Sequence, residues 1–247
     1  MKGRRALITG AGRGLGAALA VVLADLGADV VLAARDAKAL AALADTLAGR
    51  TARRPDTVQL DLADHAAVMA LTEKWRAEQR PLDLLFNNAS MWQAGAFGGS
   101  DAELIALINA NVTGTMLLTK GLLPVLQASP AADIVNVVSV SGLPQAARQN
   151  ASVGFMASKA AQAGFTDALR QELRGGPVRL TAIYPPNLED ISPLDADVWN
   201  APRDIHAWVN NRDIIDALVA ALQRGRHVAF QSIVLESATA NLHFHRN

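Results

Sequence analysis

The chain has 247 residues, of which 51% are apolar, 19% charged and only 4% aromatic. This length and composition predict a single folded domain over residues 1–247 with an aliphatic core, and they exclude a disordered chain. The 23 basic and 23 acidic side chains cancel, so no overall field attracts nucleic acid or an anionic membrane, and binding to nucleic acid is not expected.

Metal chemistry and membrane insertion also have little support in the sequence. The chain has no cysteine, which excludes disulfides, thiolate metal sites and a cysteine nucleophile. We interpret His243 and His245 as part of a polar tail, and no metal site is expected. The apolar run at residues 6–8 is far too short for a signal peptide. No later segment is expected to span a bilayer, so we expect a cytoplasmic protein without a membrane partner.

Short β-rich runs alternate with longer stretches of helical period. We expect seven strands, at residues 6–9, 29–33, 57–60, 82–87, 134–138, 178–183 and 228–235. This alternation predicts a doubly wound α/β fold, in which helices cover both faces of a seven-stranded, parallel, Rossmann-like sheet. The first helix has the clearest pattern, with apolar residues three and four apart from Leu15 to Leu26 and Gly27 as its stop. Residues 185–202 contain four prolines and predict a loop or lid over the site.

The glycine-rich segment Thr9–Gly16 follows the first expected strand and opens the first expected helix. Glycines at such a junction allow a tight turn and close backbone approach, while the N-terminus of the helix faces a diphosphate. The alternative is an ordinary turn. The residues that we expect to bind a dinucleotide are Gly10, Arg13, Gly14, Leu15 and Gly16.

The end of the second expected strand indicates which dinucleotide is bound. An acidic residue there would bind the ribose 2′-hydroxyl of NAD(H), but this chain has Ala34 followed by Arg35. Ala34 leaves room for a 2′-phosphate, Arg35 can pair with it, and Arg13 supplies a second cation. We therefore expect NADP(H). Two alternatives stay open: both arginines are merely solvated, or Asp36 restores binding of NAD(H).

Further motifs, taken with the glycine segment, resemble the short-chain dehydrogenase/reductase family over nearly the whole chain. The matching segments are Asp61-Leu62, Asn87-Asn88-Ala89-Ser90, Asn111-Val112-Thr113-Gly114, Ile134 to Ser139, and Ser158-Lys159. The resemblance implies an NADP(H)-dependent oxidoreductase acting on a small carbonyl or alcohol, and a homodimer or homotetramer. It also implies further cofactor contacts at Asp61, Leu62, Asn88, Ala89, Lys159 and Pro185.

The resemblance implies three roles at the reaction centre. Ser139 would hydrogen-bond the substrate oxygen, Lys159 would bind the nicotinamide ribose, and Asn111 would hold a water in a proton relay. Each residue also has a structural interpretation. Ser139 could be a turn residue, with Ser141 as the alternative; Lys159 could be a surface lysine; and Asn111 could brace its helix. Met91 and Trp92 either line the substrate pocket or pack in the core or at an interface.

One departure limits the expected activity. Phe155 stands where the family's YxxSK segment has its proton-donating tyrosine. A general acid contributes about 10² to 10⁴ in rate, so ordinary carbonyl reduction should be slow. The change could be engineered, or another group could donate the proton: Tyr184, the only tyrosine in the chain, Ser139, or a water held by Lys159. The competing hypothesis is a pseudoenzyme that binds NADP(H) as a sensor or structural subunit.

Overall fold

A computed structural model of the chain describes residues 1–97, 99–146 and 150–239. Its strands are β1 (Arg5–Thr9), β2 (Asp29–Ala34), β3 (Asp56–Gln59), β4 (Leu84–Asn87), β5 (Asp133–Val137), β6 (Arg179–Tyr184) and β7 (Ser232–Val234). They form one sheet in the order β3-β2-β1-β4-β5-β6-β7, and every neighbouring pair is parallel. The doubly wound α/β fold expected from the sequence is confirmed.

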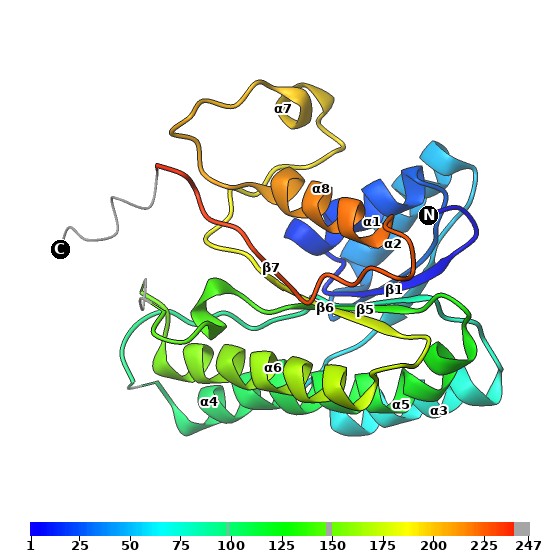
Figure 1. Cartoon of the computed structure of the whole chain (residues 1–247), viewed down its shortest axis with the longest axis horizontal. Helices are drawn as coiled ribbons and strands as arrows, with labels where there is room; N and C mark the ends of the chain where they lie inside the picture. The colour runs from blue at the N-terminus through cyan, green and yellow to red at the C-terminus, as the bar shows by residue number, and fades with distance from the viewer. Residues whose placement is uncertain (98, 147–149, 240–247) are drawn as a thin grey trace.

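Helices cover both faces of this sheet (Figure 1). One face carries α1 (Gly14–Asp25), α2 (Ala37–Thr51) and α8 (Asn211–Leu222), and the other carries α3 (His65–Ala77), α4 (Asp101–Ile108), α5 (Thr115–Ala128) and α6 (Val153–Glu172). A wide π-helical turn, η1 (Asn109–Gly114), joins α4 to α5, and a short 3-10 turn, η2 (Val140–Gly142), follows β5.

Three expectations about the second half of the chain need correction or limits. The last strand covers only Ser232–Val234, because Val228 is in a turn bonded to Gly225 and its carbonyl accepts from Arg179. The expected loop at residues 185–202 includes a short helix, α7 (Ala196–Asn200). The interpretation of His243 and His245 lies outside the described residues.

One helical run also differs from the sequence-based expectation about membranes. Among the described residues, Asp101–Ala128, which comprises α4, η1 and α5, is long and apolar enough to span a membrane by length and composition alone. Leu107, Leu118, Leu122 and Leu126 of this run are at most 1% exposed. These side chains pack inside the domain, as in the core helix of a globular fold.

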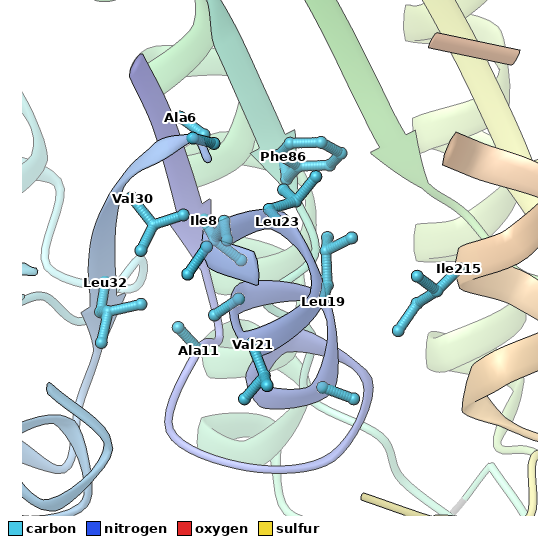
Figure 2. Close-up of a cluster of buried hydrophobic side chains, with 14 of the residues drawn as sticks. Ala6, Ile8, Ala11, Leu19, Val21, Leu23, Val30, Leu32, Phe86 and Ile215 are labelled. Carbon is cyan, nitrogen blue, oxygen red and sulfur yellow. The ribbon is translucent and has the colours of Figure 1, made fainter. Parts of the chain in front are cut away.

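The helix that follows the glycine segment is held by a cluster of buried side chains (Figure 2). Leu19 and Leu23 of α1 face Ile8 of β1 and Phe86 of β4, and Ile215 of α8 packs from the side. All five side chains are at most 1% exposed. Burying each one contributes about 1.5–3 kcal/mol. This packing fixes the axis of α1, so its first turn is held at the carboxyl ends of β1 and β4.

The strand order places a crevice at that position. From β1 the chain runs outward through β2 to β3 and then crosses to β4 on the other side of β1. Because the connections leave in opposite directions at β1 and β4, the carboxyl ends of these two strands border an open crevice, where ligands of such sheets bind. Thr9 and Asn87, which end the two strands, therefore lead into the candidate site.

The opposite, amino end of the sheet is closed by charge. The Asp133 side chain is 3% exposed and pairs with Arg4 at 2.6 Å, with Arg179 at 2.6 Å and with Arg226 at 3.0 Å. These arginines come from the N-terminal segment, from β6 and from the turn after α8. One buried carboxylate therefore ties together distant parts of the chain.

We expect Asp133→Ala to lower the free energy of unfolding by about 3–5 kcal/mol, because it leaves partly buried guanidinium groups without their carboxylate. Urea unfolding measures the loss. The matched control is Asp45→Ala, which breaks the exposed pair between Asp45 and Arg54 and should cost less than about 1 kcal/mol. Equal losses in the two variants would contradict this account of Asp133.

Candidate active site

Hydrogen bonds from one threonine join the ends of β1 and β4. The Thr9 Oγ1 accepts from the backbone N–H groups of Asn88 and Ala89, both at 3.0 Å, and donates to the Phe86 carbonyl at 3.1 Å. The Asn88 Nδ2 donates back to the Thr9 carbonyl at 2.9 Å. The floor of the crevice is thereby fixed by contacts between the ends of the two strands.

The glycines above this floor are required by contact. Gly10 and Gly14 have φ values of +69° and +58°, which L-residues with side chains rarely adopt. A Cβ on Gly16 would lie 2.3 Å from the Gly10 carbonyl oxygen and 2.5 Å from the Asn88 Nδ2. Arg13, the residue before α1, makes no side-chain cap bond. The first N–H groups of α1 are thus left to face an anion.

A cleft of about 550 Å³ opens above the turn, within the range of roughly 300–1,000 Å³ that small-molecule and cofactor sites occupy. Its wall brings together ten of the residues assigned to cofactor binding from the sequence. They are Gly10, Arg13, Gly14, Leu15, Gly16, Arg35, Asp61, Leu62, Asn88 and Ala89. The remaining two, Lys159 and Pro185, line an adjoining hollow.

The β2 end of the cleft is lined by two arginines, Arg13 and Arg35, and by Asp36. Within the described ranges, neither Arg13 nor Arg35 forms an ion pair, and both are exposed. The Asp36 Oδ1 instead accepts from the backbone N–H groups of Lys38 and Ala39 at 2.9 and 3.0 Å and caps α2. Asp36 thus serves the helix, and the arginines stay available to an anionic group.

The adjoining hollow of about 220 Å³ is lined by three of the five residues assigned to the reaction. It shares Leu15, Asn88 and Ser90 with the first cleft, so the two are continuous. Ser139, Phe155 and Lys159 line it, together with Ser141 and Trp92. Trp92 is 61% exposed and lies at the wall of the hollow, while Met91 lines the first cleft.

Ser139 has a strained backbone, with φ 145° and ψ 153°. A residue with a side chain in this region costs about 1–3 kcal/mol and persists only where its surroundings hold it. Its neighbours are fixed: the Val138 N–H donates to the Ile183 carbonyl at 2.8 Å and the Val140 N–H to the Pro185 carbonyl at 3.0 Å. Its own hydroxyl accepts from the Ser141 N–H at 3.1 Å. These hydrogen bonds hold the Ser139 hydroxyl at the wall of the hollow despite the strain.

Lys159 is buried without a carboxylate partner in the described part of the chain. Lys159 is a residue of α6, and only 3% of it is exposed. The Nζ donates to the Val137 carbonyl at 3.2 Å and to the Gln162 Oε1 at 2.9 Å, and it lies 5.6 Å from the centre of the Phe155 ring. Burial lowers the pKa of Lys159 from 10.5 to about 7. This amine is therefore balanced between its charged and neutral forms near neutral pH.

Gln162 is a site residue that sequence reasoning missed. Its Oε1 accepts from Lys159, and its Nε2 donates to the Asn111 carbonyl at 2.6 Å. The side-chain amide thus spans the gap between Lys159 and Asn111, the place where the resemblance implies a water. A polar residue three positions after Lys159, on the same helix face, is the signal that could have found it.

Asn111 does not line either cavity. It is fully buried, and its side chain accepts from the Met91 N–H at 2.7 Å and donates to the Met91 carbonyl at 2.9 Å and to the Ser158 Oγ at 3.1 Å. The observed position braces the segment after β4 against α6.

The structure does not bring Tyr184 to the reaction centre. The residue packs against Val138 and Val140. Burial raises the pKa of Tyr184 above its ordinary value of 10.0. Its side chain is absent from the wall of the hollow, so the candidate proton donor proposed from its place in the sequence has no geometric support.

Comparison with known proteins agrees with this architecture. The sequence profile described as short chain dehydrogenase matches residues 4–201. An uncharacterized oxidoreductase of Staphylococcus saprophyticus is 31% identical over 232 residues, which cover 93% of this chain and 95% of the relative.

Two solved structures with NADP bound are also similar. A metagenomic short-chain oxidoreductase is 26% identical, with a TM-score of 0.78 over 95% of this chain and 96% of the other. A short chain dehydrogenase from Burkholderia cenocepacia is 26% identical, with a TM-score of 0.79 over 97% of this chain and 98% of the other.

The buried amine should make stability depend on pH. Because burial lowers the pKa of Lys159 from 10.5 to about 7, between these values the unfolded chain binds a proton that the folded chain does not. The free energy of unfolding therefore rises with pH across this window. Below it, burial of Lys159 costs on the order of 5 kcal/mol.

We expect Lys159→Met to be more stable than the parent at about pH 7, and the difference to shrink as the pH approaches 10.5. Urea unfolding at a series of pH values measures it. Lys120, exposed on α5, provides the control, since Lys120→Met should show a constant difference. A constant difference for Lys159→Met as well would refute the account of its burial.

Proposed function

The chain belongs to the short-chain dehydrogenase family, and from this premise we propose that it is an NADP(H)-dependent oxidoreductase of a small carbonyl or alcohol. The observation that supports this proposal is that two cavities adjoin and share lining residues. One is lined by the glycine turn and by free arginines, and the other by Ser139 and Lys159. A dinucleotide lying in the first would present its reactive end to the second.

The preference for NADP(H) over NAD(H) rests on charge at the end of β2. Ala34 and Arg35 both line the cleft, and the carboxylate of Asp36 is engaged in capping α2. A 2′-phosphate would therefore meet a guanidinium in place of a carboxylate. The two similar structures that contain NADP favour the same cofactor.

On the substrate side, the residues fit a substrate with a carbonyl oxygen. Bound NADPH would supply a hydride to the carbonyl carbon. We assign Ser139, whose hydroxyl is held at the wall of the hollow, to hydrogen-bond the carbonyl oxygen. Lys159 is the group in the same wall whose pKa, about 7, suits it to release a proton near neutral pH. We therefore assign the proton step to Lys159, directly or through a water.

A second candidate function is favoured by Phe155 and Gln162. The Phe155 ring has no acidic proton to donate. The amide of Gln162 accepts a hydrogen bond from the Lys159 Nζ and donates one to the Asn111 carbonyl. With Lys159 and Asn111 already bonded to Gln162, and no acid at position 155, the chain would bind NADP(H) without turnover. This pseudoenzyme shares the cofactor site of the first proposal and differs only in the reaction.

Substitution at position 155 separates the two functions. We expect the parent to reduce aldehydes, ketones or quinones slowly with NADPH, and Phe155→Tyr to be about 10²-fold or more faster, since a positioned acid is typically worth that factor. Oxidation of NADPH against a substrate panel measures both. Phe155→Leu, which changes the ring without adding an acid, should give no gain. Tight NADPH binding without turnover in parent and tyrosine variant alike would support the pseudoenzyme.

Cofactor preference is tested at Arg35. We expect Arg35→Ala to weaken NADPH binding by about 10- to 100-fold, the loss of one charge-assisted hydrogen bond, and to leave NADH binding unchanged. Calorimetric titration of both cofactors measures the change. Arg54→Ala, which removes an exposed arginine paired with Asp45, is the control and should alter neither affinity. A similar loss for NADPH and NADH would remove the assignment of Arg35 to the 2′-phosphate.

A further inference from the structure

A carboxylate from the loop after β6 lies against the glycine turn. The distances from the position that a Cβ on Gly14 would take are 3.5 Å to the Asp190 Oδ2, 3.9 Å to its Oδ1 and 4.0 Å to its Cγ. Gly14 is the first residue of α1. The negative charge of Asp190 is therefore placed at the first turn of that helix.

The start of α8 holds this carboxylate in position. The Asn211 Nδ2 donates to the Asp190 Oδ1 at 2.5 Å and to the Ile191 carbonyl at 3.0 Å, and Asn211 itself is only 1% exposed. The backbone adds two bonds, from the Glu189 N–H to the Val209 carbonyl at 2.9 Å and from the Asn211 N–H to the Glu189 carbonyl at 3.3 Å. Asp190 is exposed, yet its segment is anchored to the buried Asn211 by three hydrogen bonds.

The surroundings of α1 explain why an anion is favourable there. The first turn of α1 contains no acidic residue, and Arg13 makes no side-chain cap bond to it. The N-terminus of a helix carries a partial positive charge, which a nearby anion stabilises. The Asp190 carboxylate lies beside this end of the helix. The diphosphate of a bound cofactor would occupy the same end of the same helix.

We propose that Asp190 is an affinity-determining residue of the cofactor site: its carboxylate stands in for the diphosphate at the N-terminus of α1 and opposes dinucleotide binding. This inference rests on the proposed function, because it takes the cleft to be a dinucleotide site. A dinucleotide must approach a fixed negative charge or displace the anchored segment 189–191. Asp190 therefore lowers the affinity of the parent for NADPH and for NADH alike.

The test is Asp190→Asn, which removes the charge and keeps an oxygen that can accept from Asn211. We expect this variant to bind NADPH about tenfold more tightly than the parent at low ionic strength, and the gain to shrink as salt screens the repulsion, from about 0.02 M to about 0.5 M. Calorimetric titration measures both. A general effect of side-chain packing would not depend on salt.

Asp197→Asn is the matched control, because Asp197 is an exposed carboxylate of α7 on the same long loop and is absent from the contacts of Gly14. It should leave the affinity unchanged. Equal or weaker NADPH binding by Asp190→Asn, with the parent binding normally, overturns the inference and leaves the proposed function intact. If the parent and both variants bind neither NADPH nor NADH, the proposed function fails, and the inference with it.

A repeat of the titrations with magnesium chloride and with a chelator excludes a different role. We expect the parent affinity to be the same in both. If the parent needs magnesium to bind NADPH and Asp190→Asn does not, the carboxylate is a ligand of a bridging cation, and its role as a competitor of the diphosphate is overturned.

Discussion

The close contact between Gly16 and Gly10, joined to the end of β4 by the hydroxyl of Thr9, is the constraint on which the rest of the site depends. A Cβ on Gly16 would lie 2.3 Å from the Gly10 carbonyl, so α1 can start this near to β1 only without a side chain there. The buried cluster of Leu19, Leu23 and Phe86 keeps the helix in that place. The free N–H groups of α1 then meet the ends of β1 and β4, where the strand order reverses.

Much of this could be predicted from the sequence, because the carrying signals are local. Alternating apolar runs predicted the sheet, and glycine spacing and Arg35 predicted the walls of the first cleft. Asp190 was missed because its importance comes from a partner far along the chain, Gly14. Gln162 has a local signal, its place three positions after Lys159, but its bond to the Asn111 carbonyl depends on the fold. Tyr184 looked well placed by its position after β6. Nothing local predicts that its side chain packs against Val138 and Val140 and does not line the hollow.

The two halves of the site differ in how they are supplied with charge. The half at the end of β2 has free guanidinium groups in the part of the chain that the structure describes, whereas the buried Lys159 in the other half donates there to two neutral oxygens. The carboxylate of Asp190 lies at the first turn of α1. A diphosphate at this turn would join the two ends of a dinucleotide. Folding alone does not require two cavities, a strained Ser139 and a buried lysine. This chain has all of these features.

The most direct measurement of the central claim is a calorimetric titration of the unaltered chain with NADPH and with NADH under the same conditions. The account predicts that both bind at one site per chain and that NADPH binds more tightly, because only its 2′-phosphate meets Arg35 and Arg13 at the end of β2. Failure of both to bind, or equal or tighter binding of NADH, would contradict it.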